Sequence, residues 1–390
     1  MRKVSCTTLV VLTAILFAGC GKKAPLTEGG SPPTPDNNKQ GRSATTQQPV
    51  IVSGLSQNIN WLVFSPNSTL CVVEGGHGKI VVIRVSDGQK VKEITAYGDP
   101  KFSPDGRLLA TGDGMGGTQF VEWETGRVQR TLPKARAVWF NRDGSKFAGA
   151  SMTKEDVSVV TVYSSSNGKT EREFRGGELG TGSGEWIVDV AFHPKDEYIA
   201  ARTRVGTVSS AVFLWEYQTG KRISLDTHAA LNSLGGREQV LFSADGKHLA
   251  LSGNQIELWE LTTRQKVKLL PRQGRGFVEL NPDWKHGLWQ ELLTDKRNNL
   301  IAEKVHLLSF PDGKERAVAT GKLIDTSTDG KLLLLREGKR LHLYDVQSAK
   351  LNRTIDGGES PISAAGFSPN GKTLAIADMR GNLRFEPIGE

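Results

Sequence analysis

One turn phrase recurs eight times along this chain of 390 residues, and the repeat restricts the fold more than any other feature. Each copy has an apolar residue, a short polar or proline-containing turn with Asp or Asn and often Gly, and then a short apolar run. The copies begin at Phe64, Phe102, Phe140, Phe192, Phe242, Leu280, Thr326 and Phe367. Their spacing runs from 38 to 52 residues, with a mean of about 43. Such a period is typical of one repeat array and not of two independent domains.

Each copy has the composition of a turn that leads into a strand. Pro sets φ at the first central turn position, Asn and Asp bond locally, and Gly accepts a positive φ. The apolar runs that follow, such as residues 108–110 and 374–376, are too short for helices. With two more short strands after each run, about 43 residues hold four antiparallel strands. The sequence therefore predicts an all-β fold, a β-propeller of eight four-stranded blades. Seven blades are the alternative, if the third or sixth copy is an irregular insertion.

The two ends of the repeat array are incomplete in complementary ways. The last copy reaches Phe385-Glu386 without a fourth strand, and the β-branched run Val50-Ile51-Val52 precedes the first copy. We expect this run to form the outer strand of the last blade, because that pairing joins the ends of the array and removes an open sheet edge.

Four aromatic–acidic pairs close the third predicted strand of their copies: Trp215-Glu216, Trp259-Glu260, Tyr344-Asp345 and Phe385-Glu386. They resemble the Trp-Asp dipeptide of WD-repeat β-propellers, and the likeness covers residues 50–390. The Gly-His dipeptide that this family carries before the first strand is absent from all eight copies, so the hydrogen-bond tetrad built on that His is not expected in its usual form. The same turn phrase also occurs in the TolB-like periplasmic propellers, which are the second family considered.

The first 19 residues have the pattern of a secretory signal peptide. Arg2 and Lys3 precede an apolar run over residues 9–18, which is too short to span a bilayer as a helix. The run ends in Ala18-Gly19-Cys20, which resembles the lipobox of bacterial lipoproteins, although Phe17 stands where Leu is usual. An ordinary signal peptide cut near Gly19 is the alternative.

The lipobox resemblance implies that Cys20 carries lipid and holds the protein on a membrane of the bacterial envelope. In that family an Asp after the Cys signals retention at the inner membrane, so Gly21 favours the periplasmic side of the outer membrane. Residues 20–49 then form a tether. They contain five Pro and only three apolar residues after the Cys, too few to offset the entropy of ordering the segment. A flexible chain of this length spans on the order of 30 Å.

The net charge of +8 first suggests a nucleic-acid partner, but its distribution does not. Residues 1–49 hold six of the 50 basic residues and two of the 42 acidic ones, which leaves 44 against 40 in the repeat array. An excess of this size is ordinary, and we expect no nucleic-acid partner.

In a propeller, the loops between strands two and three and between strands four and one share one rim. In WD-repeat proteins that rim is the usual partner surface. The most unusual loops of this chain, residues 175–186, 226–237 and 292–303, fall on it. Long loops on a rigid scaffold often carry function, and tolerated surface insertions are the alternative. The candidate partner residues are Arg175, Trp186, His228, Arg237 and Trp289, although single tryptophans are more often packing residues.

No catalytic constellation is visible. The seven His are scattered without metal-ligand spacing, and no GxSxG elbow is present. Cys71 lies in an apolar run and is expected to be buried. We therefore expect no cofactor or metal, and a monomeric, non-enzymatic, protein-binding scaffold attached to the membrane through Cys20. The alternatives are a TolB-like or outer-membrane-assembly accessory and a propeller enzyme of the lactonase or quinone-dependent type with acid or metal ligands at the channel mouth.

Overall fold

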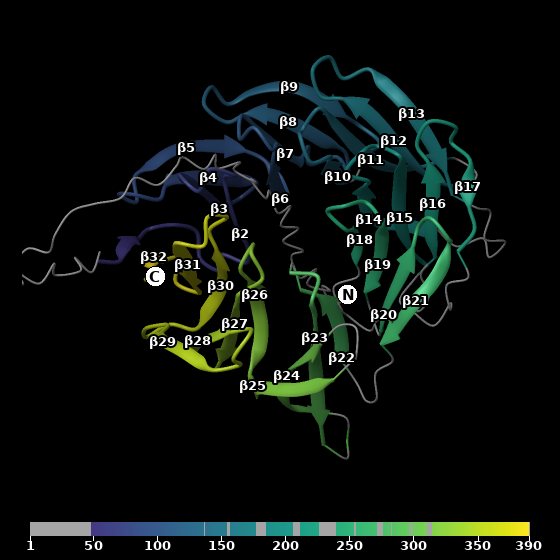
Figure 1. Ribbon diagram of the computed structural model, residues 1–390. Coiled ribbons are helices and arrows are strands. Elements are labelled where there is room, and N and C mark those ends of the chain that lie inside the picture. Colours follow the sequence, from purple (N-terminus) through teal and green to yellow (C-terminus); the bar gives the residue numbers. More distant parts are fainter. Residues whose placement is uncertain are drawn as a thin grey trace, which may run out of the picture.

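Eight four-stranded antiparallel sheets form a ring of blades, as the repeat predicts (Figure 1). The computed structural model describes residues 48–389 except 136, 154–156, 177–184, 206–210, 226–238, 253–254, 271–275, 282, 296, 298 and 310–313. No helix in this described part is long and apolar enough to cross a membrane. The eight-blade prediction is confirmed, and the seven-blade alternative is wrong because the third and sixth copies each form a complete sheet.

The first four blades follow one another in chain order, each from its inner strand to its outer strand. Their strands are β2 (Leu62–Phe64), β3 (Leu70–Gly76), β4 (Lys79–Arg84) and β5 (Lys90–Thr95); β6 (Tyr97–Phe102), β7 (Leu108–Gly112), β8 (Thr118–Glu122) and β9 (Arg127–Leu132); β10 (Ala137–Phe140), β11 (Lys146–Met152), β12 (Ser158–Ser164) and β13 (Thr170–Arg175); β14 (Glu185–Phe192), β15 (Tyr198–Val205), β16 (Val212–Glu216) and β17 (Arg222–Ile223).

The second half repeats this order until the last blade. The strands are β18 (Gln239–Phe242), β19 (His248–Ser252), β20 (Ile256–Glu260) and β21 (Gln265–Leu270); β22 (Gly276–Leu280), β23 (His286–Thr294), β24 (Leu300–Ser309) and β25 (Glu315–Thr320); β26 (Lys322–Thr326), β27 (Leu332–Glu337), β28 (Arg340–Asp345) and β29 (Leu351–Asp356); β30 (Ile362–Phe367), β31 (Thr373–Asp378), β32 (Leu383–Pro387) and β1 (Val50–Val52).

The predicted closure of the ring is confirmed. Strand β1 pairs antiparallel with β32, with Val50 opposite Phe385 and Val52 opposite Leu383. Val52 also packs into the core between the first and last blades, whereas the Ile51 side chain points outward and is 67% exposed. The last blade therefore takes its outer strand from residues 50–52, which precede the first copy of the repeat.

The core lies between blades and not inside a single sheet. In β3, Cys71 packs toward blade 8 with Phe385, whereas the next residue, Val72, packs toward blade 2 with Leu109. Because successive side chains of a strand point to opposite faces, and each face meets a neighbouring blade, the middle strands need uninterrupted apolar runs. Cys71 is fully buried, as predicted, and burial raises the pKa of its thiol.

Three of the four aromatic–acidic pairs end the third strand of their blades, and Phe385-Glu386 lies one residue before the end of β32, close to the place that the WD-repeat resemblance implies. Trp215, Trp259 and Phe385 are each only 2% exposed and fill the space between blades. They are therefore packing residues of the ring.

Candidate functional site

The two faces of the ring differ in regularity. One face carries the eight repeated turns, which connect the first and second strand of each blade. In five copies a Ser hydroxyl accepts a hydrogen bond from the backbone N–H five residues later, at 2.9 Å, and donates to the Asn or Asp two residues later, at 2.5–2.7 Å: Ser65, Ser103, Ser243, Ser327 and Ser368. These turns satisfy their own polar groups, which accounts for the recurrence of the phrase.

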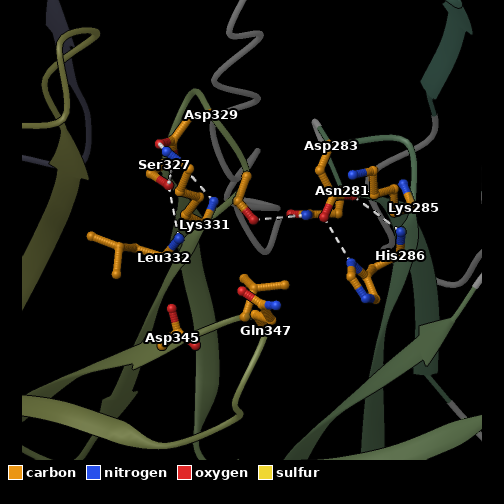
Figure 2. Close-up of polar contacts among 12 residues, drawn as sticks. Asn281, Asp283, Lys285, His286, Ser327, Asp329, Lys331, Leu332, Asp345 and Gln347 are labelled. Atoms are coloured by element: carbon orange, nitrogen blue, oxygen red, sulfur yellow. Dashed lines mark hydrogen bonds and ion pairs between the residues drawn. The ribbon is translucent and has the colours of Figure 1, made fainter.

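Side chains of the turns also join neighbouring blades. The ring of His193 in blade 4 contacts the carbonyl oxygen of Gly246 in blade 5 at 2.8 Å. Figure 2 shows the equivalent contact between blades 6 and 7, where the Asn281 amide donates to the carbonyl oxygen of Gly330 at 2.9 Å. At the ring closure, the backbone N–H of Asn370 donates to the Ser68 hydroxyl at 3.1 Å. This face is therefore a hydrogen-bonded part of the scaffold.

Two buried carboxylates reinforce the inner wall of the ring. Asp189 in β14 accepts from the backbone N–H of Val240 in β18 at 2.9 Å, and Asp325 in β26 accepts from that of Phe367 in β30 at 2.8 Å. In each pair, the acceptor lies in the first strand of one blade and the donor lies in the first strand of the next blade. These contacts give the two carboxylates a structural role.

Burial raises the pKa of Asp189 to about 6, although the donated N–H of Val240 and the charge of Lys101 favour the ionised form. No group of three or more His, Cys, Asp or Glu side chains in the described part of the chain is arranged to hold a metal ion.

The opposite rim contains a groove of about 910 Å³ that crosses blades 6, 7 and 8. Its walls come from the hairpins between second and third strands and from the connections between blades, the segments in which the sequence predicts the partner surface. They include residues 300–303 at the start of β24, 320–322 where β25 ends and β26 begins, 336–338 at the end of β27, 361–363 at the start of β30, and Met379 directly after β31.

The groove combines exposed apolar side chains with charge. Leu300, Ile301 and Met379 are 55%, 67% and 48% exposed. Charged side chains of both signs line the same groove, Lys322 and Arg336 together with Glu303 and Glu337. Neither cation has a carboxylate within 4.0 Å in the described part of the chain. Burial raises the pKa of Glu303, against the opposing effect of these two positive charges. Exposed apolar surface beside charged side chains of both signs is suited to a ligand that has apolar and charged groups.

The predicted partner residues reach different positions. Arg175 is exposed at the end of β13. Trp289 in β23 is only 8% exposed. It stacks on His306 with ring centroids 4.5 Å apart and packs in one core cluster with Ile256 of blade 5, so it is a packing residue. Trp186 lies in β14, and its side chain is outside the described part of the structure, as are Cys20, His228 and Arg237 entirely.

Among the described residues of the three unusual segments, those that line the groove belong to 292–303. In the structure this segment is mostly strand, because β23 and β24 continue to Thr294 and from Leu300. Sequence reasoning missed Lys322, Arg336, Ile362 and Met379, which come from ordinary strand ends of blades 7 and 8. The placement of the hairpins between second and third strands and of the interblade connections on this rim is the signal that points to them.

A scan against models of protein families and a search of curated proteins found no match to this chain. The fold and the geometry of the groove therefore carry the functional argument.

Proposed function

We propose that this protein is a lipid-anchored propeller of the bacterial cell envelope that holds a partner protein on the rim containing the groove. The observation that carries the proposal is the groove itself, which crosses three blades on the irregular face and is lined by exposed apolar residues. A closed ring holds these residues in fixed relative positions, which lowers the entropy cost of binding. The other face offers mainly turns whose polar groups are already paired.

The sequence supports the location. The apolar run before Cys20, with Ala18 and Gly19 directly ahead of it, fits a lipoprotein signal, and residues 21–49 provide a tether between a lipid and the ring. Gly21 favours the outer membrane over the inner one. A TolB-like or outer-membrane-assembly accessory would use the same layout, and this is an analogy of architecture only.

We propose a non-catalytic role because the buried carboxylates of the inner wall accept backbone N–H groups of the next blade. A general acid or nucleophile has to reach a substrate. Asp189 and Asp325 instead hold neighbouring blades together.

The proposal is tested by photo-crosslinking in intact cells, with a photoreactive amino acid at Met379 in the groove. The matched control carries it at Lys331, an exposed residue in a turn of the opposite face. We expect a defined protein adduct from position 379 and none from position 331. Equal adducts from the two faces, or none from the groove, would contradict the proposal. Separately, Cys20→Ser should release the protein from the membrane fraction, and a variant that stays bound as wild type contradicts the lipid anchor.

A further inference from the structure

Strand β24 extends past its neighbour and leaves a free edge. Its outer partner β25 pairs with residues 304–308, and the last pair is Lys304 with Thr320. One more contact follows, in which the N–H of Gly321 donates to the carbonyl oxygen of Glu303 at 2.8 Å. In the described part of the chain, residues 300–302 have no partner strand on this side. On the other side Leu300 and Ala302 pair with Thr294 and Leu293 of β23, and Ile301 between them forms a β-bulge. A free edge of this kind is a template for another strand.

The free edge forms one wall of the groove. The groove is lined by residues 300–303 and, next to them, by the segment 320–322 at which β25 stops. The side chains at the edge are apolar and exposed, unlike the charged residues that usually protect an edge strand. Met379 provides further exposed apolar surface in the same groove.

Charge restricts the ligand further. Lys322 lies at the end of the free edge, and Arg336 lies across from it on β27. The Arg336 guanidinium donates to the carbonyl oxygen of Ile362 at 2.9 Å, which fixes its position without neutralising it. Glu303 and Glu337 line the same groove, but neither cation has a carboxylate within 4.0 Å in the described part, so each can pair with an acidic group of a ligand.

We propose that the groove binds an extended polypeptide segment of the partner, which adds a strand to β24 at residues 300–302 and directs an acidic side chain to Lys322 and Arg336. This inference rests on the proposed function and names the chemistry of the partner. In strand addition the main-chain hydrogen bonds provide affinity, and alternate side chains provide specificity. A helical ligand has no free main-chain groups to pair with the edge.

The test uses a library of random linear 12-residue peptides displayed on phage and selected against the whole protein. We expect the selected peptides to alternate apolar residues and to contain an acidic residue. The strongest binder is then synthesised with single N-methyl groups along its backbone. Because alternate N–H groups of a strand point to the same neighbour, methylation should weaken binding at least tenfold at every second position and little between them.

Variants of the protein locate the binding. Ile301→Pro should weaken binding at least tenfold by distorting the edge, and Ile301→Ser several-fold by removing apolar surface. Met115→Ser, at an exposed apolar residue of another hairpin on the same rim, is the matched control and should bind as wild type. Lys322→Glu should weaken binding, and a peptide with Lys in place of its acidic residue should restore it. Unchanged thermal unfolding of each variant shows that the ring is intact.

Two results would overturn the inference: N-methyl effects without a two-residue alternation, or selected peptides whose affinity is unchanged by both Ile301→Pro and Lys322→Glu. The proposed function fails in a different way, when groove positions form no protein adduct in cells. If Met379 forms adducts in cells but the methylation scan shows no alternation, the groove is a partner surface and strand addition is wrong.

Discussion

The side-chain amide of Asn281 donates a hydrogen bond to the carbonyl oxygen of Gly330, 2.9 Å away in the next blade. Gly330 has φ of +70°, and a Cβ at this position would lie 2.8 Å from the Asn281 amide nitrogen and 2.7 Å from the backbone nitrogen of Asp283. The turn therefore requires glycine for two reasons: its backbone has a positive φ, and the turn of blade 6 lies too close to leave room for a Cβ. Such contacts make neighbouring blades dependent on one another.

Gly330→Ala should destabilise the protein more than Gly371→Ala. Gly371 occupies the same turn position in blade 8 with φ of +70°, but its Cβ would meet nothing within 4 Å. The control should therefore show only the backbone strain, about 1–2 kcal/mol. The Gly330 variant should lose this amount of stability and, in addition, the free energy needed to displace the turn of blade 6. Urea unfolding followed by circular dichroism measures both, and equal midpoints would show that the interblade contact contributes nothing.

Val52→Asp should open the ring, and Ile51→Asp should not. Val52 is 6% exposed in the core between the first and last blades, whereas Ile51 on the same strand is 67% exposed. An unpaired carboxylate at position 52 should lower the free energy of unfolding by about 3 kcal/mol or more. The exposed control should change it by less than about 1 kcal/mol. Thermal unfolding compares the two, and similar melting temperatures would contradict closure through β1.

Asp189 should make stability depend on pH between about 4 and 6. Its pKa in the folded protein is raised to about 6, so the folded state holds the proton over a range in which the unfolded state has lost it. Its contribution to stability is full below about pH 4 and is lost as the pH rises through 6. Relative to Asp189→Asn, which does not titrate, the wild type should therefore lose stability across this window. Urea midpoints at several pH values test this, and parallel curves would contradict the raised pKa.

Cys71 should be unreactive in the folded protein. Its side chain is fully buried and burial raises the pKa of its thiol, so little thiolate is accessible. In a chain with Cys6→Ser and Cys20→Ser, Ellman's reagent at pH 8 should label no thiol under native conditions and one equivalent in guanidinium chloride. Rapid labelling of the native protein would mean that the blade 1–blade 8 interface opens readily.

Most of the scaffold was predictable because each blade repeats the same local chemistry. Ser327 and Asp329 form their turn through bonds within six residues, and the same pattern is readable in Ser243 and Asp245. The closing strand at Val50–Val52 was also predictable, since an outer strand was missing from the last copy. Trp289 shows the limit: its position on an unusual hairpin suggested a partner residue, but its ring stacks on His306 of the adjacent strand.

The sequence by itself determined the repeat, the number of blades and the closure, because these depend on turn residues and on strand-length apolar runs that are local in the chain. It also contains the lipobox-like segment, for which a short stretch is sufficient. Only the tertiary structure decided which rim residues meet. Ile301, Lys322 and Met379 are separated along the chain and belong to three consecutive blades, and the packing of these blades side by side brings them to one groove. The free edge of β24 likewise depends on where β25 stops, which is a property of the pairing register and not of any local motif.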